Sequence, residues 1–536
     1  MGPNTRFAIM LALIAPTFPE TSVHAWRSPE TRGYKELCAS ARPSDRERRE
    51  GPHARHSLVR EGRAAPVHRV PPELLIHIFL LVRDSTRTTS WIGLTHVCRP
   101  WRTVALGTPL LWTTIPADKG LPYLRASLER SSDVLVDVIS QRASISVDAL
   151  LDTMRPHAHR LRTLKFPARS CDTVEKLITD IVAPAARLQD LALQVHTPSH
   201  NYALPQLALP EREWTGLRTL QLKGIALPGH ASSMTNLTSL ILSDVVAGAR
   251  GALESLMDQL YDCRCLRHLS ISDNCPSPLR DDDTQGTIRG RSISLPMLET
   301  LKLSAHASVV SEILASVSVP AHTRTDVKCV LDPRQTSHNL ISAILRRGPC
   351  NWESFARARS LYLFVASNIF RVRALDAGAK LLDMDIECNP PMDMSYLLPD
   401  ALCDLTQVFG CAPVRELQVF GDQRLISQDD WLESLMRLPG LEALEVGSRG
   451  QADALFQALS LSSSTPRMCP RLRKMSVGGA DVDEQAADVL LTCLDSRAAH
   501  DLRLDVLAMR KRAGRAPLTA CTVQSILTTV GVFDYR

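Results

Sequence analysis

The sequence predicts an α/β protein in which a short all-helical module precedes a long array of strand–helix units. Two observations predict this architecture. Apolar residues recur at helical spacing between residues 66 and 115. From about residue 120 onward, a short apolar pattern returns many times, with helical stretches between its copies. At 536 residues the chain is too long for one core, so several units or one extended array are expected.

Residues 70–82 predict the first helix of the N-terminal module. Pro71 and Pro72 suit a helix start, because proline fixes φ and its missing N–H falls where no intrahelical partner exists. Glu73 then lies in the first turn, where a carboxylate complements the helix dipole. The helix carries a wide apolar stripe made of Leu74, Leu75, Ile78, Phe79 and Val82.

A second helix is predicted farther along the module. Its apolar positions are Leu94, Val97, Cys98 and Trp101. The polar, threonine-rich residues 83–90 form a long connection between the two helices. Two short helices cannot cover this much apolar surface alone, so part of it is expected to face a partner. The alternative is that these residues form the core of a helical cap on the downstream array.

The order of these residues resembles an F-box, a module of three short helices. The pattern continues through Val97-Cys98-Arg99 and Trp101-Arg102 to Pro109-Leu110-Leu111-Trp112. The resemblance implies an F-box at residues 66–115 that binds the S-phase kinase-associated adaptor and, through it, cullin. The residues implied in adaptor binding are Pro71, Leu74, Leu75, Ile78, Phe79, Leu94, Val97, Cys98 and Trp101.

In the recurring pattern beyond residue 120, apolar residues occupy the first, fourth and sixth of six positions. Its copies are residues 161–166, 188–193, 217–222, 237–242, 266–271, 298–303, 414–419, 441–446 and 472–477. The last two apolar residues of each copy point to the same side of a short strand, and the leading one enters the same interior. Amphipathic stretches between copies predict helices, as at residues 174–181, 252–260 and 431–436, the last with Ser427 and Asp429 as helix-start residues.

The spacing of the copies, mostly about 20 to 32 residues, is typical of leucine-rich repeats. The sequence therefore predicts a curved, irregular leucine-rich-repeat-like α/β solenoid over residues 120–536, with parallel strands on its concave face. Residues 304–410 fit poorly, so a break there is possible, although 327–331 and 360–365 still suit strands.

Polar residues between the inward leucines are expected to face outward, where they could recognise a protein or simply remain solvated. They include Lys165, Thr219, Gln221, Ser239, His268, Ser270, Lys302, Gln418 and Glu445.

Composition excludes several classes of function. The balance of 62 basic and 57 acidic residues is too even for a nucleic-acid-binding protein. The fourteen cysteines show no zinc-finger or disulfide-scaffold spacing, which favours a reducing compartment with mostly buried free thiols. Cys263, Cys265, His268 and Cys275 lie close in sequence, but their spacing does not suit zinc. Asp281–Asp283 suits an insertion loop and lacks the ligand spacing of a calcium loop. No metal or cofactor is expected.

The N-terminal 65 residues predict a disordered or misassigned segment, because Arg, Pro, Ser and Glu dominate residues 26–69. The apolar run at residues 7–15 is too short to cross a membrane. Together with Val23-His24-Ala25, it leaves a secretory signal as an alternative. A cytoplasmic or nuclear protein without membrane attachment is the preferred reading.

No nucleophile-and-base set or phosphate-binding loop is present in the sequence, so a non-catalytic protein is expected. The resemblance implies the substrate-recognition subunit of an SCF-type cullin–RING ubiquitin ligase, with the array holding an unknown protein target. The overall pattern is similar to the large fungal set of F-box proteins. Two alternatives stay open: a repeat scaffold that acts outside a ligase, and a secreted repeat protein with a helical cap.

Overall fold

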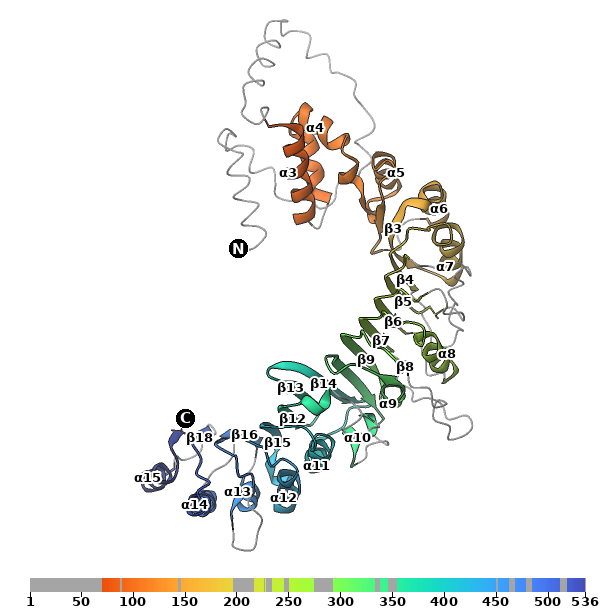
Figure 1. Cartoon of the computed structure of the whole chain (residues 1–536). Coiled ribbons are helices and arrows are strands. Elements are labelled where there is room, and N and C mark those ends of the chain that lie inside the picture. Colours follow the sequence, from red (N-terminus) through yellow and green to blue (C-terminus); the bar gives the residue numbers. More distant parts are fainter. Residues whose placement is uncertain are drawn as a thin grey trace, which may run out of the picture. The chain divides into compact units, whose positions relative to one another are not determined.

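The computed structural model describes residues 70–86, 89–142, 146–195, 216–225, 227, 234–244, 250–273, 293–332, 338–345, 354–449, 452–461, 468–478, 484–510 and 518–535. The predictions for residues 1–65, including the possible secretory signal, lie outside these ranges, as does Asp281–Asp283. The chain divides into two compact units, Met1–Ile139 and Ser140–Arg536. Both are shown in Figure 1.

The first unit begins with the predicted helical module. Its helix α3 spans Pro72–Ser85, with proline at the first helical position and Glu73 in the first turn, as the sequence predicts. The 3-10 helix η5 (Thr89–His96), helix α4 (Arg99–Leu106) and the 3-10 helix η6 (Pro109–Trp112) follow. The unit continues with two parallel strands, β1 (Thr114–Pro116) and β2 (Val136–Ile139), and helix α5 (Leu121–Arg130) between them.

The prediction of one continuous second helix from Leu94 to Trp101 is wrong. The chain leaves the 3-10 helix at His96, and Cys98 is the extended N-cap residue of α4, with φ −156° and ψ 167°. Pro100 explains the break, because a proline inside a continuous helix lacks the backbone N–H for the hydrogen bond and its ring clashes with the preceding turn, whereas a proline suits the first turn of α4. The connection between helices is also shorter than expected, since α3 continues to Ser85.

The second unit contains the predicted strands, and each copy of the apolar pattern forms one. They are β3 (Leu161–Ala168), β4 (Asp190–Val195), β5 (Thr219–Lys223), β6 (Ser239–Ser243), β7 (His268–Ser272), β9 (Thr300–His306), β15 (Glu416–Asp422), β16 (Ala443–Arg449) and β17 (Lys474–Gly478). Two further strands, β18 (Val506–Arg510) and β19 (Val532–Tyr535), extend the parallel pairing beyond β17.

The register of the parallel strands is uniform. Leu164, Leu191 and Leu220 are aligned partners on β3, β4 and β5, and all three side chains are buried. The alignment continues through Leu240 and Leu269 to β9. The leading apolar residue of every copy is buried too. Burial of the same three positions in each copy confirms the predicted orientation of these strands.

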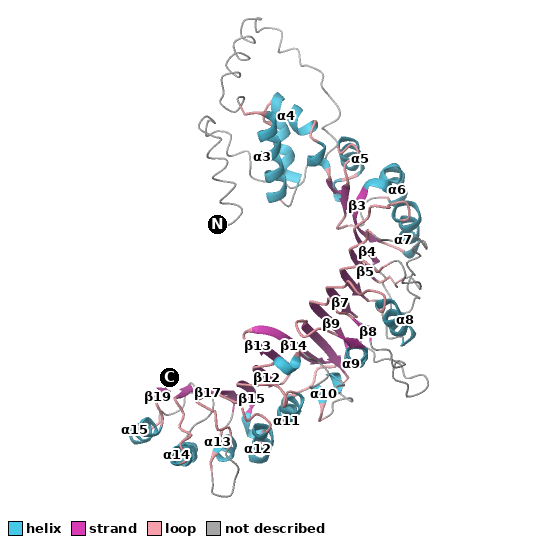
Figure 2. Cartoon of the chain, viewed as in Figure 1, coloured by secondary structure: helices cyan, strands magenta, loops and turns pink. Residues whose placement is uncertain are grey.

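Helices of the second unit cover the apolar face of the sheet (Figure 2). They include α7 (Cys171–Leu177), α8 (Arg250–Leu260), α9 (Ala307–Ser316), α10 (Leu340–Leu345), α11 (Leu398–Val408), α12 (Gln428–Met436), α13 (Asp453–Leu459), α14 (Glu484–Ala499) and α15 (Ala520–Thr529). From α9 to α15, each helix packs on the next. Ser427 is the N-cap residue of α12, as predicted, and forms a capping box with Asp430.

The poorly fitting region contains a three-stranded antiparallel meander. The two strands that the sequence suggests there are present as β11 (Arg324–Leu331) and β12 (Ser360–Ala366). The chain then turns back through β13 (Ile369–Asp376) and β14 (Ala379–Cys388), and β14 lies between β13 and β11. Both β14 and β12 run parallel to their outer neighbours, so the meander joins the two parallel arrays in one sheet.

A tight turn closes the β13–β14 hairpin. Ala377 and Gly378 both have positive φ, 48° and 86°, between the paired residues Asp376 and Ala379. A two-residue turn of this kind matches the twist of the strands that it joins. In the part of the chain that the structure describes, no helix is long and apolar enough to span a membrane.

Candidate functional site

Helix α3 presents two different apolar stripes. Leu75, Phe79 and Val82 lie in the core of the first unit, with exposed fractions of 8% or less. Leu74 and Leu81 lie about 100° away around the helix and are 57% and 53% exposed. Ile78 lies between the two stripes and is half-buried. We call Leu74, Ile78 and Leu81 the α3 stripe; it is apolar surface that the described part of the chain does not cover.

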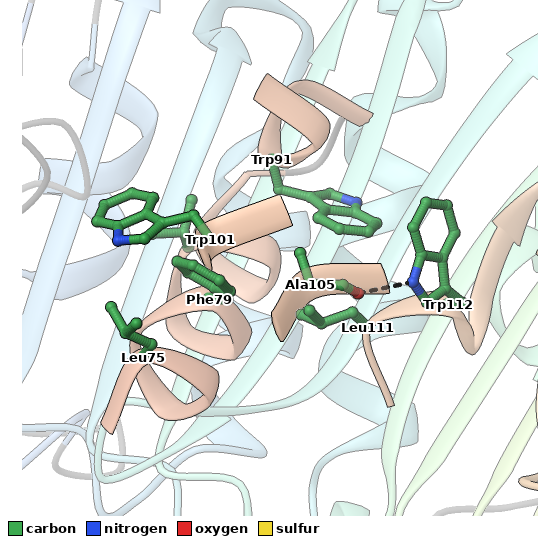
Figure 3. Packing of buried hydrophobic residues seen from close by; sticks show 8 residues of the cluster. Leu75, Phe79, Trp91, Trp101, Ala105, Leu111 and Trp112 are labelled. Atoms are coloured by element: carbon green, nitrogen blue, oxygen red, sulfur yellow. Dashed lines mark hydrogen bonds between the residues drawn. The ribbon is translucent and has the colours of Figure 1, made fainter. Parts of the chain in front are cut away.

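Aromatic side chains hold the core beneath α3. The rings of Phe79 and Trp101 meet edge to face with centroids 5.2 Å apart, and Trp91 and Trp112 do so at 5.0 Å. The indole N–H of Trp112 donates to the carbonyl oxygen of Ala105 at 3.0 Å (Figure 3). These side chains fix α3 against α4 and η6, which sets the direction in which the α3 stripe faces.

The end of α3 is tied to the segment that follows α4. Arg83 donates hydrogen bonds to the carbonyl oxygen of Leu110 and, at 3.4 Å, to the hydroxyl of Thr113. It also forms an ion pair with Asp84 at 2.8 Å. These contacts anchor the helix end next to the exposed Leu81, so the stripe is presented on a fixed helix rather than on a fraying terminus.

The structure divides the nine residues of the expected adaptor site into three groups. Pro71, Leu74 and Val97 are exposed, Ile78, Leu94 and Cys98 are half-buried, and Leu75, Phe79 and Trp101 are buried. The buried three belong to the core of the helical module itself rather than to a core shared with the repeats. Because these three side chains pack inside the module, substituting them would affect docking by disturbing the fold. Adaptor contact stays a prediction for the others.

Sequence reasoning missed two exposed apolar residues of this module. Leu81 is on α3 and Leu110, 48% exposed, is on η6. Leu81 could have been found, because it follows Leu74 by seven residues and therefore lies on the same side of the helix two turns later. Nothing in the local pattern distinguishes Leu110 from the buried Leu111 beside it.

The face of the sheet opposite the helices is polar. The outward residues predicted for it are exposed or half-buried, including Lys165, Gln221, His268, Lys302 and Glu445. They alternate along each strand with the buried apolar residues. This face is therefore a second candidate for binding, larger and more hydrophilic than the α3 stripe.

The meander contributes a ladder of ion pairs to this face. Arg371 bonds to Asp385 at 2.5 Å, and Arg373 to Asp383 at 2.9 Å. Lys380 also reaches Asp383, at 2.5 Å. Burial disfavours the charged form of Asp383, but hydrogen bonds from Lys380 and Arg373 outweigh this effect and lower its pKa. Every charged side chain of the ladder is thus paired within the sheet, with three cations to two carboxylates.

The cysteines give no reactive centre in the interior. Eleven are free in the described part of the chain, and five of these are buried. Burial raises the pKa of the Cys263, Cys329 and Cys469 thiols to about 12, so these thiols stay protonated at neutral pH and are poor nucleophiles. Within the same residues, no three His, Cys, Asp or Glu side chains gather as metal ligands. Of the four residues weighed for a metal, Cys265 and His268 are exposed and Cys275 lies outside the description.

The helical module thus has an apolar stripe that the described residues leave uncovered, a feature typical of protein-interaction sites. Residues 67–115 match the F-box-like family model. The chain thus carries an F-box-like domain, and α3, η5, α4 and η6 lie within it. A comparison with curated proteins found no match.

Proposed function

We propose that this protein is the substrate-recognition subunit of an SCF-type cullin–RING ubiquitin ligase. The F-box-like domain would bind the S-phase kinase-associated adaptor, and the adaptor would link the chain to cullin. The observation that carries the proposal is the α3 stripe, because a domain that matches the F-box-like model leaves two large leucines exposed on one side of its first helix.

The second unit would hold the target protein. We interpret its aligned strand–helix units as a leucine-rich-repeat-like solenoid, interrupted by the meander. No residue of the chain needs to perform bond chemistry in this role. Holding a target beside the ubiquitin-charged enzyme raises the effective concentration of its lysines at the transfer site. Such a subunit would work in the cytoplasm or nucleus, and we retain the similarity to fungal F-box proteins as part of the proposal.

Charge placed on the α3 stripe is expected to weaken adaptor binding strongly without unfolding the domain. Burial of one leucine side chain contributes about 1.5–3 kcal/mol. L74E/L81E should therefore weaken the affinity for the adaptor by about a hundredfold or more, because it removes two apolar contacts and buries two charges. Calorimetry with purified adaptor measures the affinity, and the melting temperature of the full chain reports whether the fold survives.

M436E is the matched control, since Met436 on α12 is as exposed as Leu74, at 57%. It should leave adaptor affinity unchanged. Native affinity in a folded L74E/L81E chain would refute the assignment of this surface. Recovery of the adaptor without cullin from cells would instead favour a scaffold that acts outside a ligase.

A further inference from the structure

Charge is distributed unevenly over the two parallel arrays of the sheet. We count the residues of strands β3–β9 together with the single residue that precedes each strand from β4 onward. These residues include six Lys or Arg and two Asp or Glu. Counted in the same way, strands β15–β19 carry five basic and six acidic residues. The first array therefore has a positive excess, whereas the second array is close to neutral.

Two lysines account for the exposed, uncompensated charge on the outward face of the first array. Lys165 on β3 and Lys302 on β9 are exposed, and each alternates with buried apolar neighbours, so both lie on the face opposite the helices. Among the described residues, neither lysine takes part in an ion pair, whereas Lys223 and Arg267 of the same array do. Asp326, the aligned neighbour of Lys302 on β11, already pairs with Arg324 at 3.2 Å.

Polar and apolar side chains alternate between the two lysines. Along the aligned row that joins them, Gln221 on β5 and Ser270 on β7 face outward and alternate with Ala192 and Ile241, while Thr219 and Ser239 lie in the adjacent row. The hydroxyl and amide groups donate hydrogen bonds to carboxylate oxygens without adding negative charge. Of the acidic residues near this face, Glu299 forms an ion pair with Arg267 at 3.0 Å, whereas Asp190 accepts a hydrogen bond from the neutral Thr163 hydroxyl at 3.2 Å and keeps its charge.

We propose that the outward face of β3–β9 binds an extended acidic segment of a partner protein. If the chain is the ligase subunit proposed above, which this inference assumes, that partner is the target. Charge complementarity carries the assignment, because an acidic segment meets unpaired ammonium groups and hydroxyl donors on this face. In the ladder of the meander, by contrast, each cation is already paired with a carboxylate.

The sheet geometry sets the length of the segment. Lys165 and Lys302 are separated by five strand steps, from β3 to β9 through the aligned rows. At about 4.8 Å per step, this separation is about 24 Å. An extended chain covers about 3.4 Å per residue, so about seven residues join the two lysines. A segment with acidic residues at both ends of such a stretch would engage both.

The test uses a fluorescent ten-residue peptide of alternating Glu and Ser, with Gln–Ser and phosphoserine versions, titrated against the full chain by anisotropy. The Glu–Ser peptide is expected to bind at low salt and the Gln–Ser peptide much more weakly. K165E/K302E should weaken binding by about tenfold or more, since reversing a charge replaces attraction with repulsion. Stronger binding of the phosphoserine peptide would identify phosphate as the source of the negative charge, and equal binding would identify carboxylates as sufficient.

K474E/R510E is the matched control, because Lys474 and Arg510 are exposed on the same face of β17 and β18 and the change in charge is identical. Equal loss of binding in the two variants would overturn the proposal, as would equal binding of the Gln–Ser peptide or no binding at low salt. If the native chain does not bind the peptide but a D281N/D282N/D283N variant does, the occupant of this face is the chain's own acidic segment. That outcome would also overturn the proposal. Adaptor affinity measured on the same variants tests the ligase proposal separately.

Discussion

F79A is expected to unfold the F-box-like domain while the second unit stays folded. Phe79 is fully buried and its ring meets that of Trp101. Truncation of a buried phenylalanine to alanine costs about 3–5 kcal/mol, because apolar contact is lost and a cavity remains. A small domain has a stability of similar size, so the change should leave it largely unfolded.

Hydrogen exchange of the full chain measures this effect region by region. In F79A, amides of α3 and α4 should lose protection, whereas those of β3–β9 should keep it, because Phe79 lies in the core of the helical module and β3–β9 belong to the other compact unit. H77A is the control, since His77 is exposed on the same helix. Native protection of α3 in F79A would contradict the observed core. Adaptor binding should be lost in F79A through unfolding, in contrast to the folded L74E/L81E.

D404A is expected to destabilise the second unit by about 2–5 kcal/mol, because it leaves one buried and one half-buried N–H group without an acceptor. Asp404 on α11 is buried and accepts hydrogen bonds from the backbone N–H groups of Ile341 and Ser342, at 2.7 and 3.0 Å. Its carboxylate thus caps the start of α10 from a helix more than sixty residues away. Chemical denaturation measures the loss, and hydrogen exchange locates it at α10.

D400A on the same helix is the control for D404A. Asp400 pairs with the exposed His338 at 2.6 Å, and a surface pair of this kind contributes about 1 kcal/mol at most. Similar destabilisation by both variants would show that the capping contact has no special role. D404N keeps an acceptor oxygen and should retain much of the stability that D404A loses.

Asp404 also predicts how the stability of the second unit depends on pH. Burial raises the pKa of Asp404 above its usual value, and hydrogen bonds from Ser342 and Ile341 only partly oppose this. The folded state therefore holds this proton more tightly than the unfolded state. The proton-linked part of the Asp404 contribution is fully present below the unfolded pKa and is lost as pH rises through the raised folded pKa, whereas the capping hydrogen bonds to Ile341 and Ser342 remain. D404N should lack this dependence in unfolding curves measured across that pH window, and an unchanged dependence in D404N would refute it.

The sequence by itself determined the local elements of this protein. Each Leu-x-x-Leu-x-Leu copy, such as Leu217–Leu222, forms a strand because alternation of apolar residues requires one buried face. The start of α3 at Pro72 and the capping of α12 by Ser427 were predictable for the same reason, since both depend on neighbouring residues alone. The turn at Ala377-Gly378 is local as well, because it depends on the positive φ of two adjacent residues.

Only the tertiary structure decided which apolar residues remain exposed and which strands become neighbours. Leu74 and Leu75 are chemically identical, yet one is exposed and the other is buried, because the position of α4 and η6 determines which side of α3 is covered. The pairing of β11 with β14, across two intervening strands of the chain, likewise depends on contacts between distant residues. Such contacts leave no periodic trace in the sequence, because burial depends on what packs against a helix or strand and not on its own residues alone.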